Sequence, residues 1–271
     1  MKRLLSYIVA LVAVVIAVSS CDVVTKTLKT NDPDYVYEQA LVLYGQEKWK
    51  SASDLFSACR HIYMGSPRED SLSFYNAHCQ FKERSYDEAA KMLDDFRKKF
   101  GRSPFIEDAE GMYALCFFYL SPEPQRDQAV TTQAIIAITE FMSRYPESDK
   151  MPQFEEMLQT LTERLMEKSY LNAYTYFKIG KYKSAIVAFK NSLKQYPESP
   201  RKEEIMYYTT VAAYRLAANS IEAKQMDRYL ATLDYYYSFV AEYPESKYMR
   251  ELDNIAERSR DFIDKNRKTE E

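Results

Sequence analysis

The stretch RYPES, at Arg144–Ser148, recurs as QYPES at Gln195–Ser199 and as EYPES at Glu242–Ser246. Proline has no backbone N–H and pushes the preceding residue out of the α region, so each tyrosine is expected to end a helix. The serine can then accept a hydrogen bond from a free N–H at the start of the next helix. Two weaker copies, YMGSP at Tyr63–Pro67 and FGRSP at Phe100–Pro104, share the aromatic residue, the breaker and the serine. These junctions predict a chain built from successive helical units.

A second break lies inside each unit. In NAYTYFKIGKYKSAIVAFKNSLKQYPES (Asn172–Ser199), the turn at Ile179–Lys181 separates two helical segments. The small, aromatic and proline positions resemble those of the tetratricopeptide repeat. We therefore predict an all-α fold, a right-handed α-solenoid of about five tetratricopeptide-like helix pairs. The expected repeats are roughly 32–65, 66–102, 103–147, 148–198 and 199–271. Longer inner connections are expected at Ser121–Gln128 and at Ala218–Asp227.

The N-terminal residues predict an exported lipoprotein. A basic Met1–Arg3 precedes the apolar run Leu4–Val18, which is too short to span a bilayer comfortably. The run ends in VSSC, which resembles a bacterial lipobox whose cysteine, here Cys21, is lipidated and becomes the first residue after cleavage. We expect a signal peptide at 1–20 and a lipidated linker at 21–31. A plain signal peptide or an uncleaved anchor helix is the alternative.

Three cysteines remain in the expected mature chain: Cys59, Cys79 and Cys116. Two of them fall where a helical repeat needs a small apolar residue, so buried thiols are the favoured interpretation. A Cys59–Cys79 disulfide is one alternative. A zinc site formed with His61 and His78 is another, although the spacing matches none of the strong metal patterns.

The sequence lacks the motifs of the common enzyme classes. It contains no G-x-S-x-G, no Walker loop, no H-E-x-x-H and no glycine-rich dinucleotide turn. Paired carboxylates such as Asp94–Asp95 and Glu203–Glu204 are interpreted as solvated helix faces. The formal net charge of −3 does not favour nucleic acid as a partner. We therefore expect a non-enzymatic protein without a cofactor or a bound metal.

Tyrosine is unusually frequent, with 24 copies, and some aromatic residues suit a peptide-binding groove. Side chains one turn either side of the small packing residue on the first helix of each pair should face such a groove. Rigid aromatic side chains provide contact area for an extended peptide. The alternative is that the repeats close onto each other and bury this stripe. The groove positions are Tyr37, Leu41 and Tyr44 in the first repeat, Phe74, His78 and Phe81 in the second, and Tyr113, Phe117 and Leu120 in the third.

The lipobox followed by five helix pairs resembles the BamD-type family of outer-membrane-assembly lipoproteins. Three stretches carry the resemblance over most of the expected mature chain: Arg126–Ser148, Asn172–Ser199 and Tyr196–Ser220. The long third-repeat loop that leads into an Arg-Asp-Gln sequence is the most specific of these features. Tetratricopeptide residues alone mark a fold and not a function.

The resemblance implies a lipid-anchored scaffold at the periplasmic face of the outer membrane. Its C-terminal repeats would dock onto POTRA domains of the barrel insertase, and its N-terminal repeats would recruit unfolded barrel proteins. Arg201 and Lys202 begin the fifth repeat, where the helix dipole mildly disfavours cations. This suggests an acidic partner outside the chain; a solvated pair is the alternative.

The residue that follows Cys21 bears on which membrane holds the lipoprotein. Asp22 follows Cys21, and in some bacteria that position retains a lipoprotein in the inner membrane. The second functional hypothesis is a tetratricopeptide lipoprotein that organises other cell-envelope or surface complexes and has no role in barrel assembly.

Overall fold

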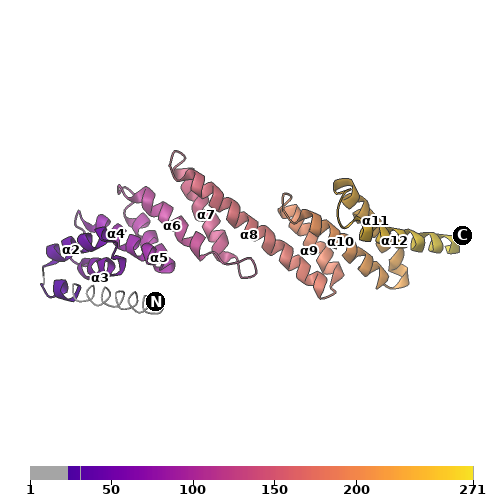
Figure 1. The fold of residues 1–271 in the computed structure, drawn as a ribbon, viewed down its shortest axis with the longest axis horizontal. Coiled ribbons are helices and arrows are strands. Elements are labelled where there is room, and N and C mark those ends of the chain that lie inside the picture. The colour runs from indigo at the N-terminus through magenta and orange to yellow at the C-terminus, as the bar shows by residue number, and fades with distance from the viewer. Residues whose placement is uncertain (1–23, 31, 271) are drawn as a thin grey trace, which may run out of the picture. The chain divides into compact units, whose positions relative to one another are not determined.

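The computed structural model describes residues 24–30 and 32–270, which are helical apart from turns and short connections. The predicted signal peptide and Cys21 lie outside the described residues. Residues 24–28 form one helical turn ahead of the longer helices (Figure 1). Those helices are α2 (Pro33–Gly45), α3 (Trp49–Cys59), α4 (Glu69–Lys82), α5 (Tyr86–Lys99), α6 (Ile106–Leu120), α7 (Ala129–Arg144), α8 (Met151–Lys178), α9 (Tyr182–Gln195), α10 (Lys202–Ala218), α11 (Glu222–Glu242) and α12 (Met249–Glu270).

Consecutive helices pack against each other, which confirms the prediction of an all-α chain of tetratricopeptide-like helix pairs. α2 packs on α3, α4 on α5, α6 on α7 and α10 on α11. α8 and α9 share a core cluster that includes Ala173, Phe177, Ala185 and Phe189. The first four predicted repeats each contain one pair. The fifth, 199–271, contains three helices, because α12 packs on α11.

The chain forms two compact units. Unit 1 contains the described residues up to Pro122 together with Ala129–Leu161, and unit 2 contains Glu123–Gln128 together with the chain from Thr162 onward. Small residues allow close helix approach in both units, since Ala52, Ala89 and Ala185 are completely buried. Large apolar side chains then fill the spaces between helices, and burying one stabilises the fold by about 1.5–3 kcal/mol. The largest fully buried ones are Phe56, Phe96, Phe141 and Phe154 in unit 1 and Phe189 and Phe239 in unit 2.

The junction serines do not cap the long helices directly, as the sequence predicts, but lie about one turn before them. At the fourth junction, Ser199 Oγ accepts a hydrogen bond from the Arg201 N–H at 3.2 Å, and the Ser199 carbonyl accepts one from the Lys202 N–H at 2.9 Å. The serine therefore starts a short turn, and α10 begins three residues after it. The same two bonds recur at Ser66, Ser103, Ser148 and Ser246.

The inner turns place one residue in the left-handed region. Gly180, between α8 and α9, has φ of 74°, as the sequence Ile-Gly-Lys suggests. The corresponding residues in the first two repeats are Glu47 and Arg84, with φ of 58° and 60°. Non-glycine residues adopt this region at a cost, so these two turns are mildly strained.

Of the two long inner connections that the sequence predicts, the first is present, and the prediction of the second is wrong. The connection at Ser121–Gln128 separates α6 from α7, and Lys168 Nζ donates to the carbonyls of Gln125 and Arg126 within it, at 3.1 and 3.0 Å. At the second site, α11 already begins at Glu222. Only residues 219–221 form the connection, and the polar residues Glu222, Lys224 and Asp227 lie on the exposed side of α11.

The three cysteines are free and buried, so the interpretation as buried thiols is confirmed and the Cys59–Cys79 disulfide is not formed. Burial raises the pKa of the Cys59 thiol to about 11 and that of Cys79 to about 12. Within the described part of the chain, no group of three or more histidine, cysteine or acidic residues is arranged to hold a metal ion.

Candidate partner-binding surfaces

Two of the six predicted groove residues in the first two repeats belong to the core. Tyr37 is 6% exposed and packs against Phe56 and Tyr63, with ring centroids 6.0 and 5.5 Å away. Phe74 is 7% exposed and stacks on Phe105 at 4.7 Å. At these two positions the side chains are buried rather than open to a groove, as the alternative hypothesis states, because the neighbouring helix pair closes over them.

The other four predicted residues, Leu41, Tyr44, His78 and Phe81, are half-buried. Tyr44 Oη and His78 Nδ1 share a hydrogen bond of 2.8 Å that joins α2 to α4. Burial and the nearby Lys82 lower the pKa of His78 to about 4, while burial raises the pKa of Tyr44 to about 12. Both groups are therefore neutral at pH 7 and present aromatic, hydrogen-bonding surface rather than charge.

Three further aromatic residues accompany them that the sequence reading did not assign to the groove. Trp49 packs edge-on against Tyr44 at 5.3 Å, and Tyr86 stacks on Tyr119 at 4.8 Å. Phe81 contacts Tyr86 and Tyr119, at 5.4 and 6.0 Å. The recurring aromatic residues on each side of an inner turn are the signal that identifies them. We call the following set the aromatic face: Tyr44, Trp49, His78, Phe81, Tyr86 and Tyr119.

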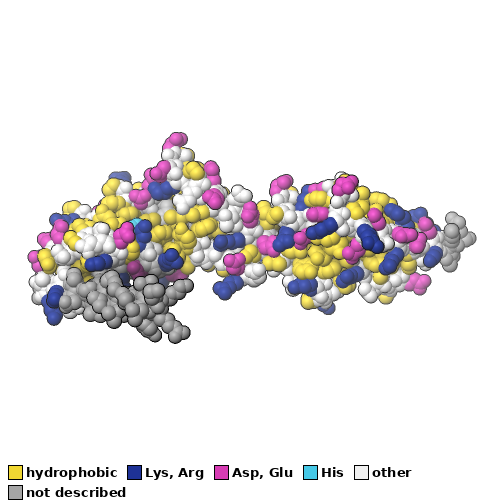
Figure 2. Space-filling view, in the orientation of Figure 1, with side chains coloured by type: hydrophobic (Ala, Val, Ile, Leu, Met, Phe, Trp, Pro, Cys, Tyr) yellow, Lys and Arg dark blue, Asp and Glu magenta, His cyan; other side chains and the backbone are white. Residues whose placement is uncertain are grey.

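The aromatic face is partly open to solvent. Tyr119 is 48% exposed, and Lys82, also exposed, places its Nζ 5.7 Å above the Trp49 ring. Figure 2 shows hydrophobic side chains gathered over α4 and α6 of unit 1. A surface of stacked rings with a cation at its edge can bind an apolar or aromatic segment and a negative charge beside it.

The predicted positions of the third repeat, Tyr113, Phe117 and Leu120, are also half-buried. The Arg97 guanidinium lies 4.2 Å from the centre of the Tyr113 ring, and the Tyr113 and Phe117 rings meet edge-on at 5.0 Å. Because a cation of α5 covers Tyr113, this residue links two helix pairs within unit 1.

Arg201 and Lys202 have acidic partners within the chain. Arg201 Nε and Nη2 donate to the two carboxylate oxygens of Glu167 on α8, at 2.9 and 3.2 Å, and Nη1 donates to Glu204 at 3.1 Å. Lys202 pairs with Glu242 at the end of α11. Because both cations are paired within the chain, their position at the start of α10 does not indicate an acidic partner outside it. Their contact with a partner remains a prediction.

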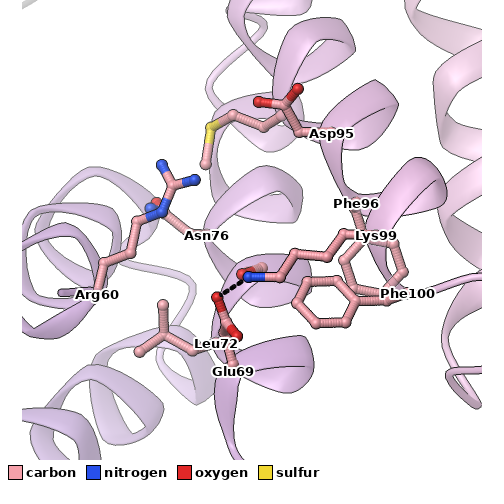
Figure 3. Close-up of a pocket in the computed structure, with 10 residues that line it drawn as sticks. Arg60, Glu69, Leu72, Asn76, Asp95, Phe96, Lys99 and Phe100 are labelled. Atoms are coloured by element: carbon pink, nitrogen blue, oxygen red, sulfur yellow. Dashed lines mark hydrogen bonds and ion pairs between the residues drawn. The ribbon is translucent and has the colours of Figure 1, made fainter. Parts of the chain in front are cut away.

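A small polar cavity between α3, α4 and α5 is not a ligand site. Its volume is about 50 Å³, which holds only a few water molecules. Figure 3 shows Lys99 reaching Glu69 across it, while Arg60 points into the same space. The hydrogen bonds from Lys99 and from the Gly65 N–H lower the pKa of Glu69. The ionised carboxylate thus ties the junction after α3 to α5.

A comparison with protein families gives a match over residues 29–187 and 166–264 to YfiO, described as an outer membrane lipoprotein. The chain belongs to the YfiO family of outer membrane lipoproteins. It is 27% identical over 228 residues to the outer membrane protein assembly factor BamD of Caulobacter vibrioides, with 80% of this chain and 73% of that protein covered. It is also similar to the TPR2AB-domain:pHSP90 complex of yeast Sti1, at 14% identity and a TM-score of 0.40, covering 84% of this chain and 98% of that one.

Membership of the family confirms the resemblance seen in the sequence, the location at the outer membrane and the expectation of a non-enzymatic protein. None of the described helices is both long and apolar enough to cross a bilayer.

Proposed function

We propose that this YfiO-family lipoprotein is a periplasmic scaffold that assists the assembly of β-barrel proteins into the outer membrane. The observation that carries the proposal is the family match over residues 29–264, together with a relative described as an outer membrane protein assembly factor. Packed helix pairs support this role, because such repeats present extended surfaces to which partners can bind.

The first part of the proposal is that Cys21 carries the lipid anchor. More than one acyl chain on one residue holds a protein firmly, since each buried CH₂ contributes about 0.8 kcal/mol. Cys21→Ala should leave the chain unprocessed or release it from the membrane fraction. A processed Cys21→Ala chain that still fractionates with membranes, with no acyl mass on the wild-type N-terminal peptide, would contradict the assignment.

The second part is that the aromatic face binds the C-terminal segment of unfolded barrel proteins. Such a segment is extended and commonly ends in an aromatic residue with a free carboxylate. Stacked rings and the adjacent Lys82 are complementary to both features. The residues proposed to make contact are Leu41, Tyr44, His78 and Phe81 from the sequence, with Tyr119 added by the structure.

Tyr119→Ala and Tyr37→Ala separate binding from stability. Tyr119 is half exposed, so its truncation should leave the unfolding midpoint nearly unchanged and weaken binding of a barrel C-terminal peptide by about five-fold or more. Tyr37 is buried, and its truncation should lower stability by about 3–5 kcal/mol. Tyr237→Ala, at an exposed tyrosine of α11, is the control. Equal peptide affinity in the wild type and Tyr119→Ala would refute the proposed site.

The third part is that the region around Arg201 and Lys202 docks the POTRA domains of the barrel insertase. Arg201→Glu alone would place a glutamate against Glu167, and the repulsion between the two carboxylates would destabilise this region. A loss of binding in that variant would therefore not separate docking from unfolding. The swapped pair Arg201→Glu with Glu167→Arg keeps an ion pair between these two positions and reverses the local pattern of charge. Glu204→Gln is added to it, because Arg201 also donates to Glu204 and the new glutamate would otherwise face that carboxylate. Co-purification of the insertase should fall while the helical circular dichroism is kept. Unchanged co-purification would remove Arg201 from the interface.

The alternative function, organisation of other cell-envelope or surface complexes, predicts a different set of partners. A tagged chain purified from detergent-solubilised envelope should bring down the barrel insertase under the first proposal. A reproducible partner set without the insertase would favour the alternative.

A further inference from the structure

The part of the chain that the structure describes begins very close in sequence to the proposed lipid anchor. Residues 21–31 were expected to be a linker, yet Val24 packs against the core of the first repeat and Thr27 is only 4% exposed. Thr30 Oγ1 donates to the Thr27 carbonyl at 2.7 Å, and the Thr30 N–H donates to the same oxygen at 3.2 Å. This segment is therefore an ordered part of unit 1.

The tether that remains is short. Only Asp22 and Val23 separate Cys21 from Val24 in the sequence. Three extended residues span at most about 11 Å. A lipid on Cys21 would therefore keep the start of the first repeat within one headgroup layer of the membrane surface, and this step depends on the proposed lipidation.

The residues next to this tether are suited to a phospholipid surface. Leu28 is 41% exposed, and Lys26 and Lys29 are exposed on the same short segment. An exposed leucine can enter the interface between headgroups and acyl chains, and lysines at this depth attract anionic headgroups. Figure 1 places this segment, in indigo, at the end of unit 1 opposite α7.

We propose that residues 24–30 form a membrane-contact surface that holds the first helix pair directly against the phospholipid leaflet. The occupant is the bilayer in which the anchor itself is inserted, because the tether is too short for another protein domain to lie between them. The start of the first repeat is then fixed at the membrane.

The test uses the lipidated full-length chain in vesicles of phosphatidylethanolamine and phosphatidylglycerol that contain brominated acyl chains. Trp49 is the only tryptophan of the chain. Trp49→Tyr removes its signal with the residue type found at the equivalent Tyr86. In this background, Leu28→Trp reports on the proposed surface, and Tyr119→Trp serves as the control in the third repeat.

Bromine should quench the emission of Leu28→Trp strongly and leave that of Tyr119→Trp unchanged. Adding Lys26→Glu and Lys29→Glu should reduce the quenching, since each lysine near an anionic surface favours contact about five-fold. Unquenched Leu28→Trp emission, or equal quenching at both positions, would overturn the membrane contact. The acyl mass on Cys21, measured on the same preparation, distinguishes the failures. With the acyl chains present only the contact is refuted, and without them the lipidation and the contact both fail.

Discussion

Lowering the pH should destabilise the first two repeats through a single histidine. His78 lies on α4 among aromatic rings, 5.4 Å from Tyr44, 5.6 Å from Trp49 and 6.2 Å from Phe74. Burial, reinforced by Lys82 and partly opposed by Asp108, lowers its pKa from 6.5 to about 4. The folded chain therefore keeps this imidazole neutral under conditions in which the unfolded chain already protonates it.

The sign and size of the effect follow from linkage. Between pH 6.5 and about 4 the unfolded state binds more protons at this site than the folded state, so the free energy of unfolding falls as the pH falls. One pKa unit corresponds to about 1.4 kcal/mol. Because solvent partly screens the half-buried ring, the loss should be on the order of 1 kcal/mol at pH 5 and about 2 kcal/mol below pH 4.

Urea unfolding followed by the fluorescence of Trp49 measures this loss, because the indole lies beside His78. The wild type and His78→Gln are compared at pH 7.5 and pH 5. The difference between them isolates the histidine, since the carboxylates titrate in both proteins. His61→Gln, at an exposed position, should behave like the wild type. If the wild type and His78→Gln lose the same stability between the two pH values, the imidazole is not held neutral by burial and the reasoning is refuted.

Further predictions concern the turns and the ion pair of α10. Gly180→Ala should lower stability by about 1 kcal/mol, because φ of 74° is unfavourable for alanine, whereas Gly45→Ala, at the end of α2 with open space around it, should leave stability unchanged or raise it by up to about 1 kcal/mol. Thermal unfolding measures both, and a loss at Gly45 equal to that at Gly180 would contradict the conformational explanation. Glu167→Gln should lower stability by about 1 kcal/mol, reduced by the partial exposure of the pair, and the loss should shrink in high salt. An unchanged loss in 1 M salt would show that Glu167 acts through packing rather than charge.

Local rules acting on neighbouring residues allowed the sequence alone to predict the helix pairs. Proline after Tyr145, Tyr196 and Tyr243 blocks a continuing helix whatever the rest of the fold does, and these helices end at Arg144, Gln195 and Glu242. The repeat pattern likewise predicts that Ala52 and Ala185 are packing positions, and both side chains are fully buried. The family resemblance was also visible in the sequence, since it depends on the order of these motifs.

Only the tertiary structure decided which polar and aromatic side chains remain available to partners. Tyr37 and Tyr44 have the same residue type and similar places in the repeat pattern, yet the first is buried and the second is half-buried, because the next helix pair covers them to different extents. The sequence alone does not show the partner of Arg201, because Glu167 lies a full helix pair earlier in the chain. The two side chains meet only when α8 and α10 pack together. Burial and ion pairing depend on contacts between residues distant in sequence, and periodicity within one helix does not determine them.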